Sequence, residues 1–509
     1  MKKINKYTTS FMLALLLIIG ACSDVLDELP ENESLTGDTD YTISDNMILP
    51  VLGAYEGLYT RGWEEGLLLG VRGDDVNAGG LGDQQPFWDT DAFKYDKNYW
   101  MYNSVWQLHY NDIIRATTAI GEIEKYRDNG GPDALADQYV AECKTIIAYL
   151  YLNLAQTFGD VIVIGSLDAI AATPVSTRSD VMQHIVDEMA EAIPLLPPVN
   201  PNKRTDIKGG ITRFTALAVQ AMANQELENY QGVADATSQI ISSGEYQLDP
   251  DFYGLFKLNG KLNDENILEL QYSDFGQGTG PSEFHLFAPY GPQSWTPAVT
   301  GKNGGWGFYE PSEKYIKFML DRGEQVRLET SVIFTPDGMA QIESDPNYSP
   351  LPAWLSNTTR DGDRFNNAAR ANFHSGKHYL PSNQLTDGRN GYGNNKNYTV
   401  IRYAEILLMH AEALTRGASS SAMTADDAVN AVRSRAGLGN LGGVTTEQVL
   451  DEKYAELAME WGKRFHDMVR TGNAAALSYD GRTFTMDLAR LPYPQAQLDE
   501  LKQLDGGAI

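Results

Sequence analysis

Cysteine and positive charge are both scarce in this sequence of 509 residues, and each shortage excludes a class of protein. Two cysteines cannot build a disulfide framework or a cysteine-based metal cluster. The 40 basic residues are outnumbered by 68 acidic ones, which gives a formal net charge of −28. Such a chain repels nucleic acids and anionic membrane surfaces, so we expect no nucleic acid as a partner. Hydrophobic residues make up 42% of the chain, which is enough to bury a large core.

The N-terminal apolar run is too short to cross a membrane. Three lysines precede the unbroken apolar stretch 11–19, and the small residues Gly20 and Ala21 follow it. A membrane-spanning helix needs about 20 apolar residues, whereas a signal peptide has a shorter apolar region behind positive charges. This arrangement therefore predicts a secretory signal peptide at 1–21.

The two cysteines have different predicted roles. Residues 19–22 read Ile-Gly-Ala-Cys, which resembles the bacterial lipobox, where the cysteine is lipidated and becomes the first mature residue. We expect Cys22 to carry the lipid anchor and 22–40 to form a solvated tether. The alternative is an ordinary signal peptide with an incidental cysteine. Cys143 lies on a helical apolar stripe, and we predict a small buried hydrophobic residue there.

Apolar residues recur every three or four positions in two parts of the chain, which predicts amphipathic helices. The predicted helices are 104–126, 136–158, 178–196, 212–229, 231–243, 398–416, 424–436 and 446–470. Thr445 and Gln448 fit a capping box at the start of the last one. Trp106 and Trp461 lie on apolar stripes, so we predict core positions for both.

Two neighbouring helices resemble a tetratricopeptide unit. The first ends near a short polar turn at 230–232, and the second has Ala234 and Ala236 at close-packing positions. Residues 404–437 look like a looser copy. Stacked helix pairs of this kind bury a continuous core. We therefore expect a mostly α-helical fold built on an irregular tetratricopeptide-like scaffold.

The helical pattern is missing from residues 60–103 and fades between 249 and 397, except near 312–320. Glycine, proline, asparagine and aromatic residues dominate there, and long irregular stretches usually have a functional reason. We divide the mature chain into an N-terminal helical scaffold at 41–248, a loop-rich inserted ligand-binding subdomain at 249–397, and a C-terminal helical scaffold at 398–509. The loops at 60–103 are expected on the ligand side.

Several segments, none of them specific alone, together point to one family. They are SDVLDELP after the lipobox, AYEGLY, AYLYLNLAQTFGDV, TRFTALAVQAMANQEL, SSGEYQL, VIRYAEILLMHAEAL, NAVRSRAGL and RLPYPQAQLD. With them the chain resembles the SusD/RagB family of outer-membrane lipoproteins of Bacteroidetes along its full length. The last long helix departs from the family pattern, because it reads DEKYAEL and EWGKRFHDMVR, although Arg464 and Asp467 remain.

The resemblance implies a binding protein, not an enzyme, that is lipid-anchored in the outer membrane and exposed at the cell surface. It implies a SusC-like TonB-dependent transporter barrel as partner, with the helix pairs facing the barrel. The loops would hold an oligosaccharide or polysaccharide, and no cofactor is expected. Two alternatives stay open: a peptide-binding protein like the RagB branch, and an extracellular glycoside hydrolase, which would need a pair of carboxylates across the bond.

Exposed aromatic rings are the best candidates for a glycan site, because an indole or phenol ring covers the C–H face of a sugar. Five of the eight tryptophans are flanked by glycine, proline, aspartate or asparagine: Trp63, Trp88, Trp295, Trp306 and Trp354. The segments PFWDTD and YGPQSWTPAVTGKNGGWGFYEP are favoured, since turns do not readily place a large ring under a helix. We predict Trp88, Trp295 and Trp306 as platforms, with Trp354 as a further candidate. The alternative is that each ring anchors its own loop.

Polar contacts to the glycan are predicted at four further positions. Arg72 and Asp75, in GVRGDDVNAGG, lie in a region from which the family often supplies contacts. Asp89 and Tyr309 are candidates because each is close in sequence to a chosen tryptophan. The alternative for Arg72 is an arginine–aspartate ion pair that fixes the loop.

Metal signals are weak. His374 and His378 are four residues apart, but Gly376 between them disfavours a helix and no third ligand is near. Asp361 and Asp363 resemble part of a calcium loop, without the glycine and distal glutamate of an EF-hand. We predict no metal site from the sequence, and a structural calcium remains open.

Overall fold

The computed structural model describes residues 39–59, 62–165, 173–279, 287–295, 304–388 and 395–506. The predicted signal peptide, the lipidation at Cys22 and nearly all of the tether lie outside the described residues. Among the residues described, no helix combines the length and the apolar character that crossing a bilayer requires.

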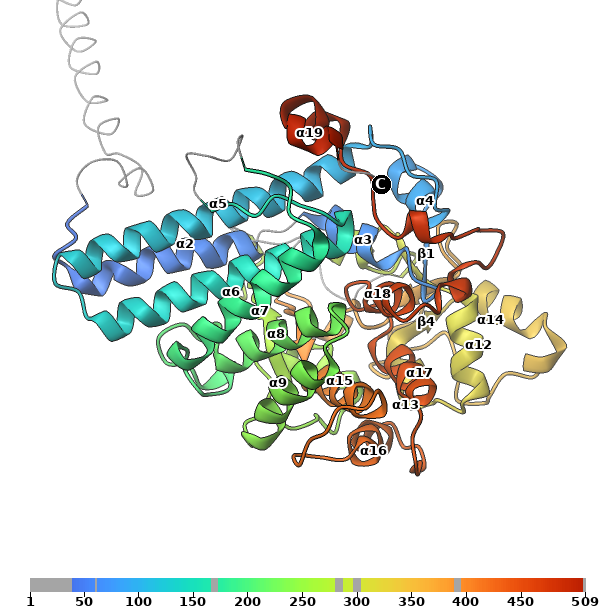
Figure 1. The fold of residues 1–509 in the computed structure, drawn as a ribbon. Helices are drawn as coiled ribbons and strands as arrows, with labels where there is room; N and C mark the ends of the chain where they lie inside the picture. Colours follow the sequence, from blue (N-terminus) through green and yellow to red (C-terminus); the bar gives the residue numbers. More distant parts are fainter. Residues whose placement is uncertain are drawn as a thin grey trace, which may run out of the picture.

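Helices that pack on one another in chain order form the scaffold (Figure 1). They are α2 (Ile48–Tyr59), α5 (Trp100–Asp128), α6 (Asp133–Phe158), α7 (Arg178–Ala192), α8 (Arg213–Glu226), α9 (Tyr230–Ser242), α15 (Tyr403–Thr415), α16 (Ala425–Arg435) and α17 (Thr446–Leu457). The N-terminal and C-terminal parts of the scaffold meet where α15 packs on α9. The prediction of a mostly α-helical fold is confirmed.

Individual core predictions on the scaffold are also confirmed. Trp106 is buried, with its ring centroid 5.1 Å from that of Phe158. Cys143 is fully buried, and burial raises the pKa of its thiol, so it behaves as a small hydrophobic residue. The capping box at the start of α17 is present, with the Thr445 and Gln448 side chains each accepting a backbone N–H of the other residue.

The two regions predicted to be loop-rich contain short helices, most of which the sequence pattern did not show. The helices are α3 (Trp63–Gly70), α4 (Gln85–Asp91), α10 (Phe252–Leu255), α11 (Phe287–Tyr290), α12 (Glu313–Asp321), α13 (Val326–Ser331) and α14 (Pro336–Glu343). Of these, only α12 was predicted. Two further helices lie near the C-terminus, α18 (Lys463–Arg470) and α19 (Gln495–Glu500).

Within the described residues, three two-stranded antiparallel sheets connect these regions. The pairs are β1 (Val76–Ala78) with β3 (Tyr309–Pro311), β2 (Asn266–Leu270) with β6 (Tyr398–Arg402), and β4 (Val332–Phe334) with β5 (Phe373–Ser375). The first pair joins the 60–103 region to the inserted region. The predicted helix at 398–416 therefore begins as a strand, because β6 pairs with β2 before α15 starts.

The single helix predicted at 446–470 is wrong, because the chain breaks into α17 and α18. Met459, Trp461 and Gly462 adopt left-handed backbone conformations between them. The polar groups freed by the break are bonded: Lys377 Nζ donates to the carbonyls of Glu456 and Ala458 at 2.8 and 2.9 Å. Trp461 is half-buried and lies outside both helices, and its Nε1 donates to a backbone carbonyl of β6.

Gly462→Ala should lower the free energy of unfolding by at least about 2 kcal/mol. Gly462 has a φ of +71°, and an added Cβ would lie 2.4 Å from the Leu69 carbonyl oxygen. Gly437→Ala is the matched control, because Gly437 has a φ of +77° but open space around the added Cβ. Urea unfolding gives the loss in free energy of unfolding for each variant. The loss in Gly437→Ala comes from the backbone conformation alone, so the additional loss in Gly462→Ala measures the clash. Equal losses in the two variants would contradict this account.

A buried ion cluster joins α13, β6, α16 and α17. Each of its three arginines lies within hydrogen-bond distance of two or more glutamates, Lys377 pairs with Glu460, and most of the side chains are fully buried. The cluster comprises Arg327, Arg402, Arg435, Lys377, Glu265, Glu324, Glu452, Glu456 and Glu460. Charges removed from water need partners of this kind to be tolerated. The cluster therefore fixes the inserted region onto the C-terminal scaffold.

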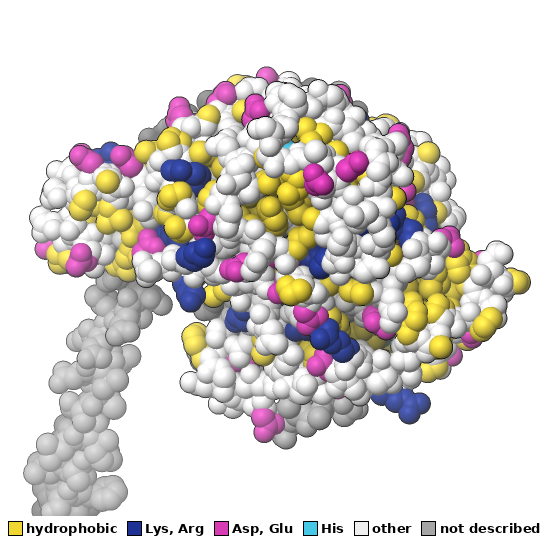
Figure 2. Space-filling view, turned by 90° about the horizontal axis from the view of Figure 1, so that it is seen from below, with side chains coloured by type: hydrophobic (Ala, Val, Ile, Leu, Met, Phe, Trp, Pro, Cys, Tyr) yellow, Lys and Arg dark blue, Asp and Glu magenta, His cyan; other side chains and the backbone are white. Residues whose placement is uncertain are grey.

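Figure 2 shows one face of the molecule, seen from below the view of Figure 1. Acidic and basic side chains are interspersed on it, with hydrophobic side chains between them. A field of one sign is what attracts a polyion. This face therefore offers no extended area of one charge.

Candidate ligand-binding surface

Aromatic rings from three separate segments meet at one place. Trp63 begins α3, Trp100 begins α5, and Trp306 and Phe308 precede β3. The Trp63 ring centroid lies 6.0 Å from that of Trp100, 5.7 Å from that of Trp306 and 6.2 Å from that of Phe308. Trp100 is 50% exposed, while Trp63 and Trp306 are partly buried. Together with Trp88 these residues are called the aromatic surface below.

Trp88 is connected to the other residues of the aromatic surface by hydrogen bonds through Gly79. Trp88, on α4, is 41% exposed, and its Nε1 donates to the Gly79 carbonyl at 3.2 Å. The Gly79 N–H in turn donates to the Phe308 carbonyl at 2.7 Å. A Cβ at Gly79 would lie 2.1 Å from the Gly307 carbonyl oxygen, so only glycine permits this approach. The exposed indole is thereby held in place by backbone contacts.

Polar side chains border the aromatic rings. Arg370 donates from Nη2 to both carboxylate oxygens of Asp83 at 2.8 Å and from Nε to the Trp306 carbonyl at 2.8 Å. Its guanidinium lies 5.1 Å from the Phe308 ring centroid. Partial burial raises the pKa of Asp83, but the bonds from Arg370 outweigh this and lower it. Asp89 is half-buried and accepts a hydrogen bond from the Tyr99 hydroxyl.

Two of the predicted platforms, Trp88 and Trp306, therefore lie on the aromatic surface. Trp63 and Trp100 join them, although neither was chosen from the sequence. Trp100 is the first residue of α5, four residues before the predicted start of this helix. A large ring at that position, in the first helical turn, has no preceding turn to cover it, and this signal was available.

The prediction that Trp295 is an exposed platform is not supported, because this residue is only 5% exposed. Its ring stacks on Phe365 with centroids 5.2 Å apart and meets the Tyr379 ring edge-on at the same distance. These rings form a small separate hydrophobic cluster with Ile333. Trp295 therefore anchors its own loop, which is the alternative that the sequence left open.

Arg72, Asp75 and Tyr309 are also buried, and none of them is placed to contact a ligand at the surface. The Arg72 guanidinium lies 4.3 Å from the Phe465 ring centroid. Asp75 Oδ2 accepts the Met459 N–H at 2.6 Å, and burial raises the pKa of Asp75 to about 6. Tyr309 packs edge-on against Tyr290, with centroids 4.9 Å apart.

The ion pair suggested for Arg72 is formed by a different arginine. Asp74 accepts hydrogen bonds from Arg464 Nε at 2.6 Å and lies 2.8 Å from Lys314 Nζ. The loop after α3 is thus fixed from α18 and α12. Because α18 covers this loop, the charged residues of the loop support the fold and do not face solvent.

Two carboxyl groups near the aromatic surface have strongly raised pKa values. Burial raises the pKa of Asp91, at the end of α4, to about 7, and that of Glu310, in β3, to about 7. Asp91 accepts the Ala78 N–H at 3.0 Å, and Glu310 accepts the Asn372 N–H at 2.6 Å. Both carboxyl groups therefore hold backbone segments together, and their environment accounts for them without a catalytic role.

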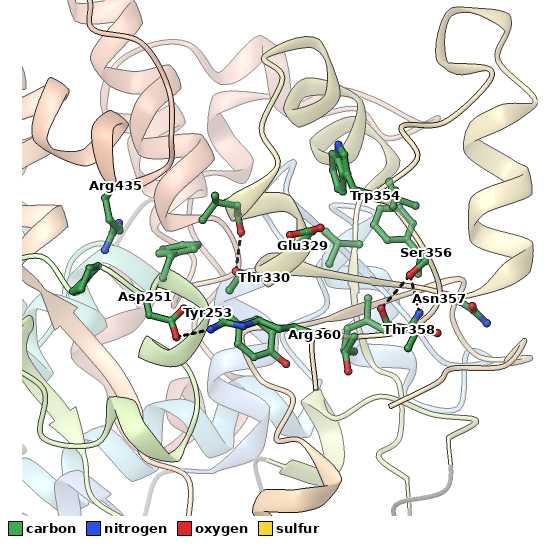
Figure 3. A pocket seen from close by; sticks show the side chains of 18 residues that line it. Asp251, Tyr253, Glu329, Thr330, Trp354, Ser356, Asn357, Thr358, Arg360 and Arg435 are labelled. Atoms are coloured by element: carbon green, nitrogen blue, oxygen red, sulfur yellow. Dashed lines mark hydrogen bonds and ion pairs between the residues drawn. The ribbon is translucent and has the colours of Figure 1, made fainter. Parts of the chain in front are cut away.

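Trp354 lies elsewhere, at a cavity of about 490 Å³ between α10, α13, α16 and the segment 354–360 (Figure 3). The ring is partly buried. Polar side chains line the same cavity: Asp251, Glu329, Thr330, Asn357, Arg360 and Arg435. The structure thus brings Trp88 and Trp306 together and places Trp354 at a second location.

His374 and His378 do not form part of a metal-ligand group among the described residues. His374 lies in β5, and its two ring nitrogens have no hydrogen-bond partner in the described part of the chain. Burial lowers the pKa of His374 to about 3. Folding therefore keeps this ring neutral at pH values where the unfolded chain would bind a proton.

His374→Phe should make the protein more resistant to acid. The unfolded histidine has a pKa near 6.5, so the wild type loses stability as the pH falls from 6.5 toward 3. The free energy of unfolding of the variant minus that of the wild type should therefore be roughly 2 kcal/mol larger at pH 5 than at pH 8. Urea unfolding at both pH values measures this. An unchanged difference between pH 8 and pH 5 would contradict it.

Comparison with known proteins finds matches to two family models. Residues 264–487 match the SusD family, and residues 81–225 match a family described as starch-binding associating with outer membrane. A SusD-like protein P2 from Formosa agariphila is 25% identical over 502 residues, covering 92% of this chain and 90% of that protein. A SusD-like protein from Bacteroides ovatus is 22% identical over 476 residues, covering 89% of this chain and 80% of that protein.

Solved structures share the fold. Surface glycan-binding protein A from Bacteroides thetaiotaomicron, in complex with laminarihexaose, superposes with a TM-score of 0.73 at 24% identity. A laminarin binding SusD-like protein superposes with a TM-score of 0.74 at 23% identity. Each comparison covers 90% of this chain and 98% of the other.

Proposed function

Since this chain belongs to the SusD/RagB family, we propose that it is a non-catalytic surface lipoprotein that binds oligosaccharides or polysaccharides through the aromatic surface. The observation that carries the proposal is the group of four tryptophans from α3, α4, α5 and the segment before β3, of which Trp88 is 41% and Trp100 is 50% exposed. Indole rings that are held in place but open on one face suit the apolar face of a sugar.

The polar border supports the same ligand class. Asp83 and Arg370 lie at the edge of the rings, and Asp89 lies on α4 beside Trp88. Hydroxyl groups both donate and accept, so a sugar can bond to a carboxylate and a guanidinium at once. The named relatives that bind laminarin or laminarihexaose make a β-glucan the first ligand to test.

Delivery of the bound glycan to a SusC-like TonB-dependent transporter barrel is part of the proposal. The lipid on Cys22 would hold the protein at the outer membrane, and the match to a family associating with the outer membrane supports that location. The scaffold helices, which lie in a continuous stack, would face the transporter. Asp89 and Trp354 remain proposed glycan contacts, the first at the aromatic surface and the second at its own cavity.

The proposal is tested with the soluble chain that lacks residues 1–22. Native gels containing laminarin, starch, xylan or inulin should retard the protein for at least one polysaccharide, and no new reducing ends should appear. Retardation with release of reducing ends would favour a glycoside hydrolase. Absence of retardation in all four, together with binding to an immobilised peptide mixture, would favour the peptide-binding alternative.

A further inference from the structure

The cavity at Trp354 shares no lining residue with the aromatic surface. Its walls come from α10, α13, β4, α16 and the segment 354–360, all of which lie in the described part of the chain. A volume of about 490 Å³ falls within the range of small-molecule sites. This cavity is therefore large enough for a ligand of its own.

Aromatic side chains line the cavity at Trp354. Trp354 and Tyr253 are both partly buried, so part of each ring is open. Figure 3 shows them on different sides of the pocket, with Glu329 between them in this view. The Tyr253 ring is fixed, because its hydroxyl donates to Asp361 Oδ2 at 2.5 Å and the Arg360 guanidinium lies 5.1 Å from its centroid. Rings held in this way suit a ligand with apolar C–H faces.

The charges on the walls balance. Asp251 and Glu329 are acidic, and Arg360 and Arg435 are basic. Arg360 Nη1 lies 2.5 Å from Asp251 Oδ1, and Arg435 is paired outside the cavity with Glu265 and Glu456. A polyanion would meet two carboxylates and a polycation two guanidinium groups. The cavity therefore favours a neutral ligand.

Two polar groups at the cavity, Arg435 and Glu329, can bond to a ligand. The Arg435 side chain is only 3% exposed, and its Nε–H has no acceptor within the described chain. Buried donors without acceptors are rare in folded proteins, so such a group points to a ligand or water that completes it. Glu329 is exposed, and its Oε1 accepts a hydrogen bond from Gln325 Nε2 at 3.3 Å, so its carboxylate can also accept from a ligand hydroxyl.

We propose that this cavity is a second glycan-binding site, which takes a neutral saccharide segment of roughly one or two rings. The inference rests on the proposed function, because it assumes that the protein binds glycans. Trp354 and Tyr253 cover the C–H faces of the sugar, a sugar oxygen accepts from Arg435 Nε, and a hydroxyl donates to Glu329. The aromatic surface and this cavity then hold two parts of one glycan or two glycans.

Calorimetric titration of the chain lacking residues 1–22 tests the second site. The probe is the hexasaccharide of whichever polysaccharide is retained in the gels: laminarihexaose, maltohexaose, xylohexaose or the inulin-type fructohexaose. We expect two binding events in the wild type. Trp354→Ala should remove one of them, and Trp88→Ala with Trp306→Ala should remove the other.

Glu329→Gln guards against a folding defect in Trp354→Ala, since Glu329 is exposed and the change preserves its shape. It should weaken the event assigned to the cavity by about three- to tenfold. Glu228→Gln is the matched control, because Glu228 is exposed on the turn between α8 and α9, and it should change nothing.

The outcomes separate the two proposals. The second site alone is overturned if the wild type shows a single binding event that the Trp88 and Trp306 changes abolish. In that case Trp354→Ala and Glu329→Gln would bind with wild-type affinity. Failure of every polysaccharide to be retained overturns the proposed function, and the second site falls with it.

Discussion

Replacing Trp88 and Trp306 together by alanine should reduce the affinity for the retained polysaccharide at least a hundredfold. A central aromatic residue in a binding site is worth about 2 kcal/mol or more when truncated, which is roughly thirtyfold in affinity. The two rings belong to one cluster, so their effects should add only in part. Affinity electrophoresis over a series of polysaccharide concentrations measures the loss, and circular dichroism confirms the fold.

Tyr41→Ala is the control for this double variant. Tyr41 is also partly buried, and it packs on Tyr126 near the opposite end of α5 from Trp100. It should keep the wild-type affinity. Full affinity in the double variant, with an intact fold, would remove the aromatic surface as the glycan site. An equal loss in Tyr41→Ala would attribute the effect to general destabilisation.

Glu456→Ala should destabilise the protein by about 3–5 kcal/mol, because it leaves buried guanidinium groups without a shared partner. Glu456, on α17, accepts hydrogen bonds from Arg402 at 2.5 Å, from Arg327 at 3.2 Å, and from Arg435. Burial raises the pKa of Glu456, but the three arginines outweigh it and hold that pKa well below its usual range. Urea unfolding at pH 7 measures the loss.

The pH dependence of this loss follows from the sign of the shift. A carboxyl group whose pKa is depressed on folding contributes stability above its unfolded pKa of about 4.5, and this stability is lost as the pH falls. The gap between wild type and Glu456→Ala should therefore narrow below pH 4.5. Glu447→Ala, an exposed change on the same helix, should cost about 0.5 kcal/mol or less. Similar losses in the two variants would contradict the role given to the ion cluster.

The scaffold could be predicted from the sequence because each of its helices buries one continuous stripe of apolar side chains. Helices α5 to α9 lie within a few residues of the predicted ranges, since apolar spacing and Ala-rich packing positions specify them locally. The break between α17 and α18 could not be predicted from the spacing of apolar residues, which continues through it. It depends on Lys377 and Asp75, which reach the freed backbone groups from other parts of the chain.

The candidate binding site was predictable only in part, because contacts between distant segments decide which rings stay exposed. Glycine and proline near a tryptophan indicate a turn, but they do not reveal whether another loop covers the ring. Trp88 is exposed and Trp306 is partly exposed, whereas Trp295 is covered by Phe365 and Tyr379, which lie 70 and 84 residues further along the chain. Arg72 was misjudged in the same way, because α18 returns over its loop from the far end of the chain.

The length of α5 has a consequence for how the molecule is placed. Trp100 opens this helix and Tyr126 lies near its end, where Tyr41 packs against it with ring centroids 5.0 Å apart. A helix of 29 residues is about 43 Å long. The described chain therefore starts near one end of α5, and Trp100 of the aromatic surface lies at the other end. If the protein is held by its N-terminal end, as proposed for the lipid on Cys22, the aromatic surface lies away from the point of attachment.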